Sequence, residues 1–99
     1  MQHFETKAEA IDWITTQNKR VLVVKCNTCQ ECLDFFNDEL VDWADNIRVD
    51  IEWASVDLEE FADDNIHQYR WVDRLLYPLG AVSSDELTKL SDKINSLSL

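Results

Sequence analysis

The sequence predicts an α/β fold in which a central mixed sheet has helices on both faces. Three observations lead to this prediction. Helix-type and strand-type patterns alternate along most of the chain. The run Val21-Leu22-Val23-Val24 is uninterrupted and rich in β-branched residues, as expected for a strand covered on both sides. Capping-box sequences precede the first and the last amphipathic segments, which indicates helices with defined starts.

The N-terminal half predicts a strand, a helix, the central strand and a second helix. Residues 1–4 are a candidate edge strand. Residues 6–9 (Thr-Lys-Ala-Glu) fit a capping box, and apolar residues then recur at helical spacing up to the polar run 16–19. After the central strand, helical spacing runs from Gln30 to about Asp45. The apolar side of this second helix comprises Leu33, Phe36, Leu40 and Trp43, flanked by Phe35, Val41 and Ala44.

The C-terminal half is less regular. Alternating apolar and acidic residues over 49–53 predict a strand that ends near Asp57, followed by a short helix over 59–67. Residues 69–82 fit neither period and contain the only proline and the only glycine of the chain. Residues 83–86 form a second capping box, and apolar residues then repeat every three or four positions, which predicts a terminal helix.

The composition predicts one globular domain over residues 1–99. A length of 99 residues lies near the commonest domain size, and 45% of the residues are hydrophobic. Twenty acidic residues against nine basic ones give a formal net charge of -11, and no Lys/Arg stripe is available for phosphate groups. No apolar stretch reaches the roughly 18 residues of a membrane span. We therefore expect a cytoplasmic protein, monomeric or weakly dimeric, that binds neither nucleic acid directly nor a membrane.

The strongest chemical feature is the cluster Cys26, Cys29 and Cys32, which forms two overlapping CxxC spacings between the central strand and the second helix. With Cys29 at the helix cap and Cys32 three residues on, both side chains share one helix face, where a disulfide can open and close easily. Free N–H groups and the positive end of the helix dipole would stabilise a thiolate at Cys29. Cys29 is thus the predicted attacking thiol and Cys32 the predicted resolving thiol.

Strand 21–24, the motif Cys29-Gln30-Glu31-Cys32 and the amphipathic helix together resemble the active-site unit of thioredoxins and glutaredoxins. The resemblance implies a thioredoxin-like three-layer sandwich with a mixed sheet. It also implies a thiol-disulfide oxidoreductase that acts on protein disulfides without a cofactor.

The resemblance continues downstream. Residues 53–57 are similar to the next strand of the family, residues 69–72 to the loop after its short helix, and residues 80–82 with the last helix to its final segment. Tyr77-Pro78 resembles the X-Pro, usually cis, that faces the CxxC pair. The resemblance therefore implies that Tyr77, Pro78 and Thr28, which precedes Cys29, contact the substrate.

Several positions depart from the family pattern. Thr28 replaces the tryptophan before the first cysteine, and Gln30-Glu31 replaces the Gly-Pro between the cysteines. The valines at 23–24 occupy the stretch that carries the buried carboxylate of thioredoxins. Few residues separate Pro78 from the last helix, which predicts an abbreviated C-terminal hairpin. A carboxylate between the two thiols opposes thiolate formation, so we expect slow disulfide reduction.

Two other interpretations of the cysteines remain open. Cys26 lies at a strand end and is expected to be a buried bystander, with a third redox or metal-binding role as the alternative. Zinc would need His3 or His67 as a fourth ligand, and the second cysteine pair of a zinc ribbon is absent. We therefore expect no metal.

A function of another class also remains open. The second helix carries Asp34, Asp38, Glu39, Asp42 and Asp45, and residues 57–64 add further carboxylates. Such a surface could attract a basic protein, or imitate nucleic acid to a protein that binds it. The alternative function is therefore a redox-inactive, acidic binding module of the same fold, an adaptor or an inhibitor.

Overall fold

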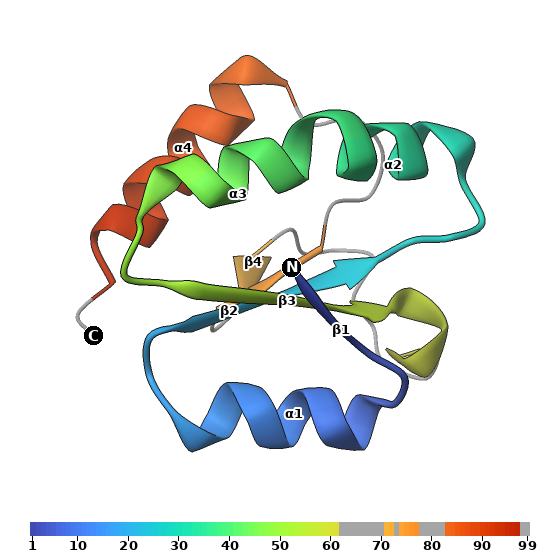
Figure 1. Ribbon diagram of the computed structural model, residues 1–99. Helices are drawn as coiled ribbons and strands as arrows, with labels where there is room; N and C mark the ends of the chain where they lie inside the picture. Colours follow the sequence, from blue (N-terminus) through green and yellow to red (C-terminus); the bar gives the residue numbers. More distant parts are fainter. Residues whose placement is uncertain (62–70, 73, 78–82, 98–99) are drawn as a thin grey trace.

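The computed structural model has an α/β architecture in which a five-stranded sheet lies between two layers of helices (Figure 1). It describes residues 1–61, 71–72, 74–77 and 83–97. In chain order the elements are β1 (Gln2–Phe4), α1 (Lys7–Thr16), β2 (Arg20–Lys25), α2 (Gln30–Phe35), the π-helical turn η1 (Phe36–Leu40), α3 (Val41–Ile47), β3 (Glu52–Asp57), the 3₁₀ turn η2 (Leu58–Phe61), β4 (Trp71–Val72), β5 (Leu75–Leu76) and α4 (Ser84–Asn95).

The sheet has the strand order β1-β3-β2-β5-β4. The first four strands in this order run parallel to their neighbours, and β4 pairs antiparallel with β5. The predicted mixed sheet is thus confirmed, as is the edge strand at the N-terminus. Strand β2 lies in the middle, and Val21, Leu22, Val23 and Val24 are all 0% exposed, which explains their uninterrupted apolar run.

The β4–β5 pair is short, with two residues in each strand. It precedes Pro78, whereas the sequence predicts an abbreviated hairpin between Pro78 and the last helix. Residues 78–82 lie outside the described part of the chain, so the segment in which that hairpin is predicted is not described. Arg74, between the two short strands, has a φ of 71°, in the left-handed region.

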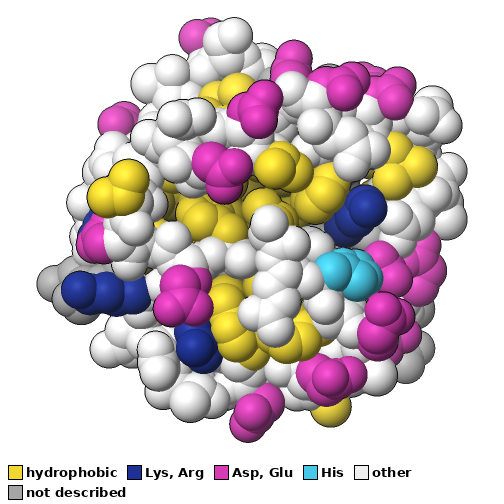
Figure 2. Space-filling model, in the orientation of Figure 1, with side chains coloured by type: hydrophobic (Ala, Val, Ile, Leu, Met, Phe, Trp, Pro, Cys, Tyr) yellow, Lys and Arg dark blue, Asp and Glu magenta, His cyan; other side chains and the backbone are white. Residues whose placement is uncertain are grey.

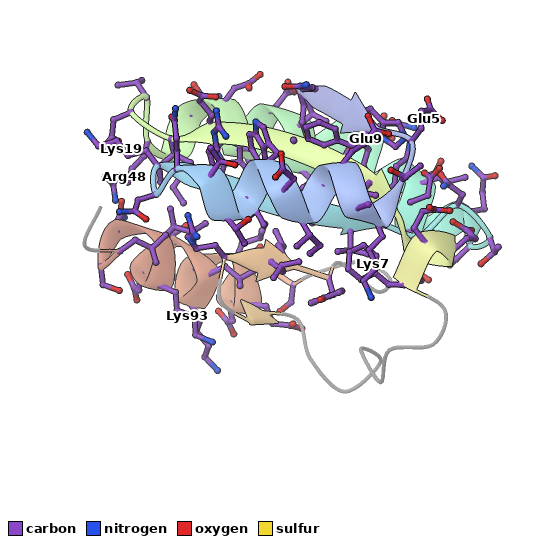
Figure 3. All side chains as sticks on the ribbon, turned by 90° about the horizontal axis from the view of Figure 1, so that it is seen from below. Glu5, Lys7, Glu9, Lys19, Arg48 and Lys93 are labelled. Carbon is purple, nitrogen blue, oxygen red and sulfur yellow. The ribbon has the colours of Figure 1, made fainter. Side chains whose placement is uncertain are left out.

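Helix α1 covers one face of the sheet (Figure 3). It begins at the predicted capping box, where the Thr6 side chain accepts a hydrogen bond from the Glu9 N–H. Ala10 and Ile14 pack from this helix onto the sheet. The core on this face consists of Ala10, Ile14, Leu22, Val24, Ala54, Val56, Phe61 and Tyr77.

The long helical segment α2–η1–α3 and the terminal helix α4 cover the opposite face (Figure 1). Their core consists of Val21, Val23, Phe35, Phe36, Leu40, Ala44, Ile51, Trp53, Leu76, Leu90 and Ile94. The Ser83 side chain caps α4 by accepting from the Glu86 N–H, as its capping box predicts. Helices on both faces are therefore confirmed.

The second helix contains a feature that the hydrophobic pattern does not predict. Regular helical spacing places Leu33 and Trp43 on its apolar side, but both are only partly buried, and the fully buried side chains include Cys32 and Phe35. The cause is the π turn Phe36–Leu40, which takes up one more residue than an α-helical turn and shifts the buried side of the helix.

Strand β3 begins later than predicted. Val49 is 97% exposed and Asp50 belongs to a turn in which the Arg48 guanidinium donates two hydrogen bonds to the Asp50 carboxylate. The alternation at 49–53 therefore reflects a turn followed by a strand. The predicted short helix begins as the 3₁₀ turn Leu58–Phe61, and its remainder lies outside the described residues.

Candidate active site: a cluster of three thiols

The three cysteines lie where β2 passes into α2. Strand β2 ends at Lys25, Cys26 follows it directly, and Cys29 is the N-cap of α2 with an extended backbone (φ −115°, ψ 120°). Asn27 ties the connecting loop to the end of β3, because its Nδ2 donates to Asp57 Oδ1 at 2.5 Å. The loop that carries the thiols is thus held at the carboxyl end of the two central strands.

The thiols differ in their access to solvent. Cys26 and Cys32 are 8% and 5% exposed, whereas Cys29 is half-buried. All three are free thiols. The predicted attacking residue is therefore the thiol that a bulky substrate reaches most easily, and the predicted resolving residue lies one helical turn behind it.

Cys26 has more polar partners than a bystander needs. Its Sγ lies 3.5 Å from Thr28 Oγ1. It also accepts from the N–H groups of Thr28 and Cys29 and is in hydrogen-bonding contact with the Cys32 thiol. Burial raises the pKa of Cys26, but these hydrogen bonds outweigh it and bring the pKa below the ordinary value of 9.0. The expected burial of Cys26 is confirmed, while its partners make it more than a packed side chain.

The predicted substrate-binding residues do not all lie beside the thiols. Thr28 is exposed and adjoins Cys29, although its hydroxyl is directed to Cys26. Tyr77 is 6% exposed and packs in the core on the α1 face of the sheet, opposite the face that α2 covers. Little of its side chain is therefore available to a substrate. Pro78 lies outside the described residues.

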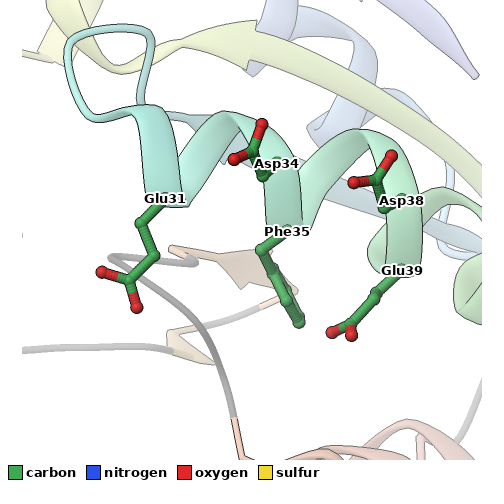
Figure 4. A pocket seen from close by; sticks show the side chains of 5 residues that line it. All are labelled: Glu31, Asp34, Phe35, Asp38 and Glu39. Carbon is green, nitrogen blue, oxygen red and sulfur yellow. The ribbon is translucent and has the colours of Figure 1, made fainter.

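An acidic hollow lies on the outer side of α2 and η1 (Figure 4). It has a volume of about 370 Å³ and is lined by Glu31, Asp34, Phe35, Asp38 and Glu39. Asp34 accepts a hydrogen bond from Gln30 Nε2 at 2.8 Å. Four carboxylates around one largely buried aromatic side chain give a site that favours cations over anions.

The thiols have a polar neighbourhood that the sequence alone does not reveal. His3, on the edge strand, lies directly across from Ser55 in the β1–β3 register. Its Nδ1 lies 2.8 Å from Ser55 Oγ, and its Nε2 lies 3.6 Å from Asp57 Oδ1. These three residue types also form hydrolase triads, but Ser55 is only 4% exposed and cannot reach a substrate. Only the sheet register, which the sequence does not state, brings them together.

A second hollow lies between α3 and the start of β3. Figure 2 shows apolar side chains along a groove on this side of the molecule, below the helix layer, and acidic side chains along the upper rim. The hollow, of about 420 Å³, is lined by Met1, Ala44, Asp45, Arg48, Val49, Ile51, Glu52 and Trp53. It carries no thiol and is separate from the cysteine cluster.

Metal ligands do not converge in the described residues. Within residues 1–61, 74–77 and 83–97, no group of three or more His, Cys, Asp or Glu side chains is arranged to hold a metal ion. His67, one candidate for the fourth zinc ligand, lies outside this part of the chain. In the same residues, no helix combines the length and the apolar character that crossing a membrane requires.

Comparison with known proteins adds no family to this description. No protein-family model matches the chain, and neither a curated protein nor a solved structure shows significant similarity. The fold and the site therefore define the protein only as a class. It is an α/β protein with a mostly parallel sheet and a cluster of free thiols where the central strand meets a helix.

Proposed function

We propose that the protein is a thiol-disulfide oxidoreductase of the thioredoxin type, with Cys29 as the attacking thiol and Cys32 as the resolving thiol. The observation that supports this most is the difference between the two residues. Cys29 is half-buried at the N-cap of α2, whereas Cys32, one turn further along, is 5% exposed. An accessible thiol at a helix N-terminus and a sheltered thiol behind it suit attack and resolution, respectively.

The reaction has two exchange steps. The Cys29 thiolate attacks a substrate disulfide, forms a mixed disulfide and releases one substrate thiolate. Cys32, as its thiolate, then attacks Cys29 Sγ, releases the second substrate thiolate and leaves a Cys29–Cys32 disulfide. The substrate is reduced by two electrons, and the protein is oxidised by two.

A thioredoxin-like fold is part of the same proposal. Its support is the parallel arrangement β1-β3-β2, with the cysteines following the central strand and preceding the helix that covers one face. The exposed Thr28 is a candidate substrate contact beside Cys29. Tyr77 contributes to the site through packing, since its side chain lies in the core.

The test uses single serine variants of the full chain. Cys32→Ser retains the attacking thiol and should accumulate a stable mixed disulfide at Cys29 with the neutral probe 4,4′-dithiodipyridine. Cys29→Ser should lose turnover in insulin reduction driven by dithiothreitol. If Cys29→Ser reduces insulin as fast as the unaltered protein, the proposal is wrong.

A second function, an acidic module that binds a basic protein, is favoured by the hollow on α2 and η1. Among the described residues, no Lys or Arg lies within 4 Å of its four carboxylates, so their charge is available to a partner. Oligolysine should then bind with an affinity that falls steeply with salt, even when all three cysteines are serine. Asp34→Asn/Asp38→Asn should weaken this binding, and an unchanged affinity would exclude the hollow as its site.

A further inference from the structure

The redox site contains a third thiol that the two-cysteine mechanism does not use. Cys26 and Cys32 are the two most buried thiols, and their side chains are in hydrogen-bonding contact. Cys32 thus has a possible partner on each side, the half-buried Cys29 and the buried Cys26. Resting on the function proposed above, this arrangement raises the question of where the disulfide finally resides.

We propose that Cys26 takes over the disulfide after substrate reduction. The Cys26 thiolate attacks Cys32 Sγ in the Cys29–Cys32 disulfide. The Cys29–Cys32 bond breaks, the Cys26–Cys32 bond forms, and Cys29 leaves as a thiolate at the N-terminus of α2. The exchange is an isomerisation: one S–S bond replaces another, and the transfer needs no external oxidant or reductant.

The surroundings of Cys26 suit it to this attack. The Thr28 hydroxyl, 3.5 Å from the sulfur, and the N–H groups of Thr28 and Cys29 provide hydrogen bonds that a thiolate can accept. Burial raises the pKa of Cys26, and these hydrogen bonds lower it further than burial raises it. The bond from Asn27 to Asp57 holds the intervening loop in place, so the three sulfurs stay close during the exchange.

The product state also differs in a useful way. A Cys26–Cys32 disulfide joins two side chains that are each less than a tenth exposed, whereas a Cys29–Cys32 disulfide includes the accessible sulfur. External thiols attack a buried disulfide more slowly. The transfer would therefore store the oxidised state away from solvent and return a free thiol at the surface.

The experiment locates the disulfide in the full chain. Reduced protein receives one equivalent of diamide, is quenched with acid at intervals, and its free and oxidised cysteines then receive different alkyl labels. Fragment spectra of the tryptic peptide 26–48 assign the labels. In the unaltered protein the free thiol should move from Cys26 to Cys29, with at least fivefold more free Cys29 than free Cys26 at equilibrium. Cys29→Ser should form a Cys26–Cys32 disulfide by itself.

Two variants separate this inference from the proposed function. Cys26→Ser leaves only Cys29 and Cys32, so failure to form their disulfide reversibly would overturn the proposed function. If Cys26→Ser oxidises normally but the unaltered protein retains free Cys26 at equilibrium, only the transfer is disproved. Thr28→Val should slow the transfer about tenfold, the loss expected for one hydrogen bond to a charged group. Thr28→Ser, which keeps the hydroxyl, should restore the rate, and tryptophan fluorescence verifies that each variant is folded.

Discussion

The Arg74 guanidinium caps α1 from the far end of the sequence, because its Nη2 donates to the Ile14 carbonyl at 2.9 Å. Its Nη1 donates to the carbonyls of Gln17 and Asn18 at 3.0 and 2.6 Å. Helix α1 has no basic residue in its own last turn. A residue between two short strands therefore supplies the cation that favours a helix C-terminus.

Arg74→Ala should lower the free energy of unfolding by about 1–2 kcal/mol, because three carbonyl groups lose a charged donor. Arg74→Gly loses the same hydrogen bonds but relieves the strain of a φ of 71°, so it should be about 1 kcal/mol more stable than Arg74→Ala. Urea denaturation of both variants measures the difference. Equal stabilities would show that the backbone at Arg74 is not strained.

The lowered pKa of Cys26 predicts a pH-dependent stability. In the folded protein, the hydrogen bonds to its sulfur outweigh burial, so Cys26 loses its proton at a lower pH than it does in the unfolded chain. Between the folded pKa and the unfolded value near 9.0, only the unfolded chain holds the proton, and stability therefore rises with pH. Below the folded pKa this contribution is lost.

The measurement compares unfolding of the reduced protein and of Cys26→Ser between neutral and alkaline pH. The difference in the free energy of unfolding should grow in favour of the unaltered protein as pH rises. Thiolate absorbance at 240 nm should show one early transition that is missing from Cys26→Ser. A constant difference in stability across this range would contradict the assignment.

Asp50 and Arg48 predict a contribution in acid. Hydrogen bonds from Arg48 lower the pKa of Asp50 below its ordinary 3.8, and the Asp50 carboxylate in turn raises the pKa of Arg48. Because the folded pKa of Asp50 is the lower one, the stabilisation is complete above the unfolded pKa and is lost as pH falls through the folded value. Asp50→Asn should therefore flatten the acid limb of the stability curve.

Arg48 has a second role, which provides a control. Its Nη1 donates to the carbonyls of Ile94 and Leu97 at 3.1 and 3.4 Å and so ties the turn after α3 to the end of α4 (Figure 3). Arg48→Met should increase amide hydrogen exchange in the last turn of α4, whereas Asp50→Asn should increase it less. Equal exchange in the two variants would assign the tie to the ion pair.

Glu31 predicts the effect of charge beside the thiols. It lies between Cys29 and Cys32 in the sequence and lines the acidic hollow. Neutralising it in Glu31→Gln should raise the rate at which Cys29 reacts with 4,4′-dithiodipyridine several-fold, since an adjacent carboxylate opposes thiolate formation. Glu39→Gln makes the same charge change two helical turns away and should leave the rate nearly unchanged. A similar acceleration in both variants would indicate a general field rather than a local one.

The sequence predicts the regular elements of this chain well. Strand β2 follows from four consecutive apolar residues, and the starts of α1 and α4 follow from Thr6 and Ser83, whose side chains make the expected capping bonds. These features depend on neighbouring residues alone, so a local pattern is sufficient to predict them.

The site was predicted only in part, because its polar contacts come from tertiary structure. The spacing of the cysteines places Cys29 at the N-cap. The same spacing does not reveal that Cys26 turns toward Thr28 and Cys32, or that the sheet register sets His3 opposite Ser55. The strand at 49–53 failed for a similar reason, since the Arg48–Asp50 turn overrides the alternation.

The π turn Phe36–Leu40 also has a consequence for the thiols. Each residue of a regular helix advances the chain by about 100° around the axis, so this turn acts as a gauge between the two ends of the segment. Deleting one residue within it would rotate α2 by about that angle relative to α3. Cys32 would then leave the core, and the sheltering of one sulfur therefore depends on main-chain geometry more than a turn away from it.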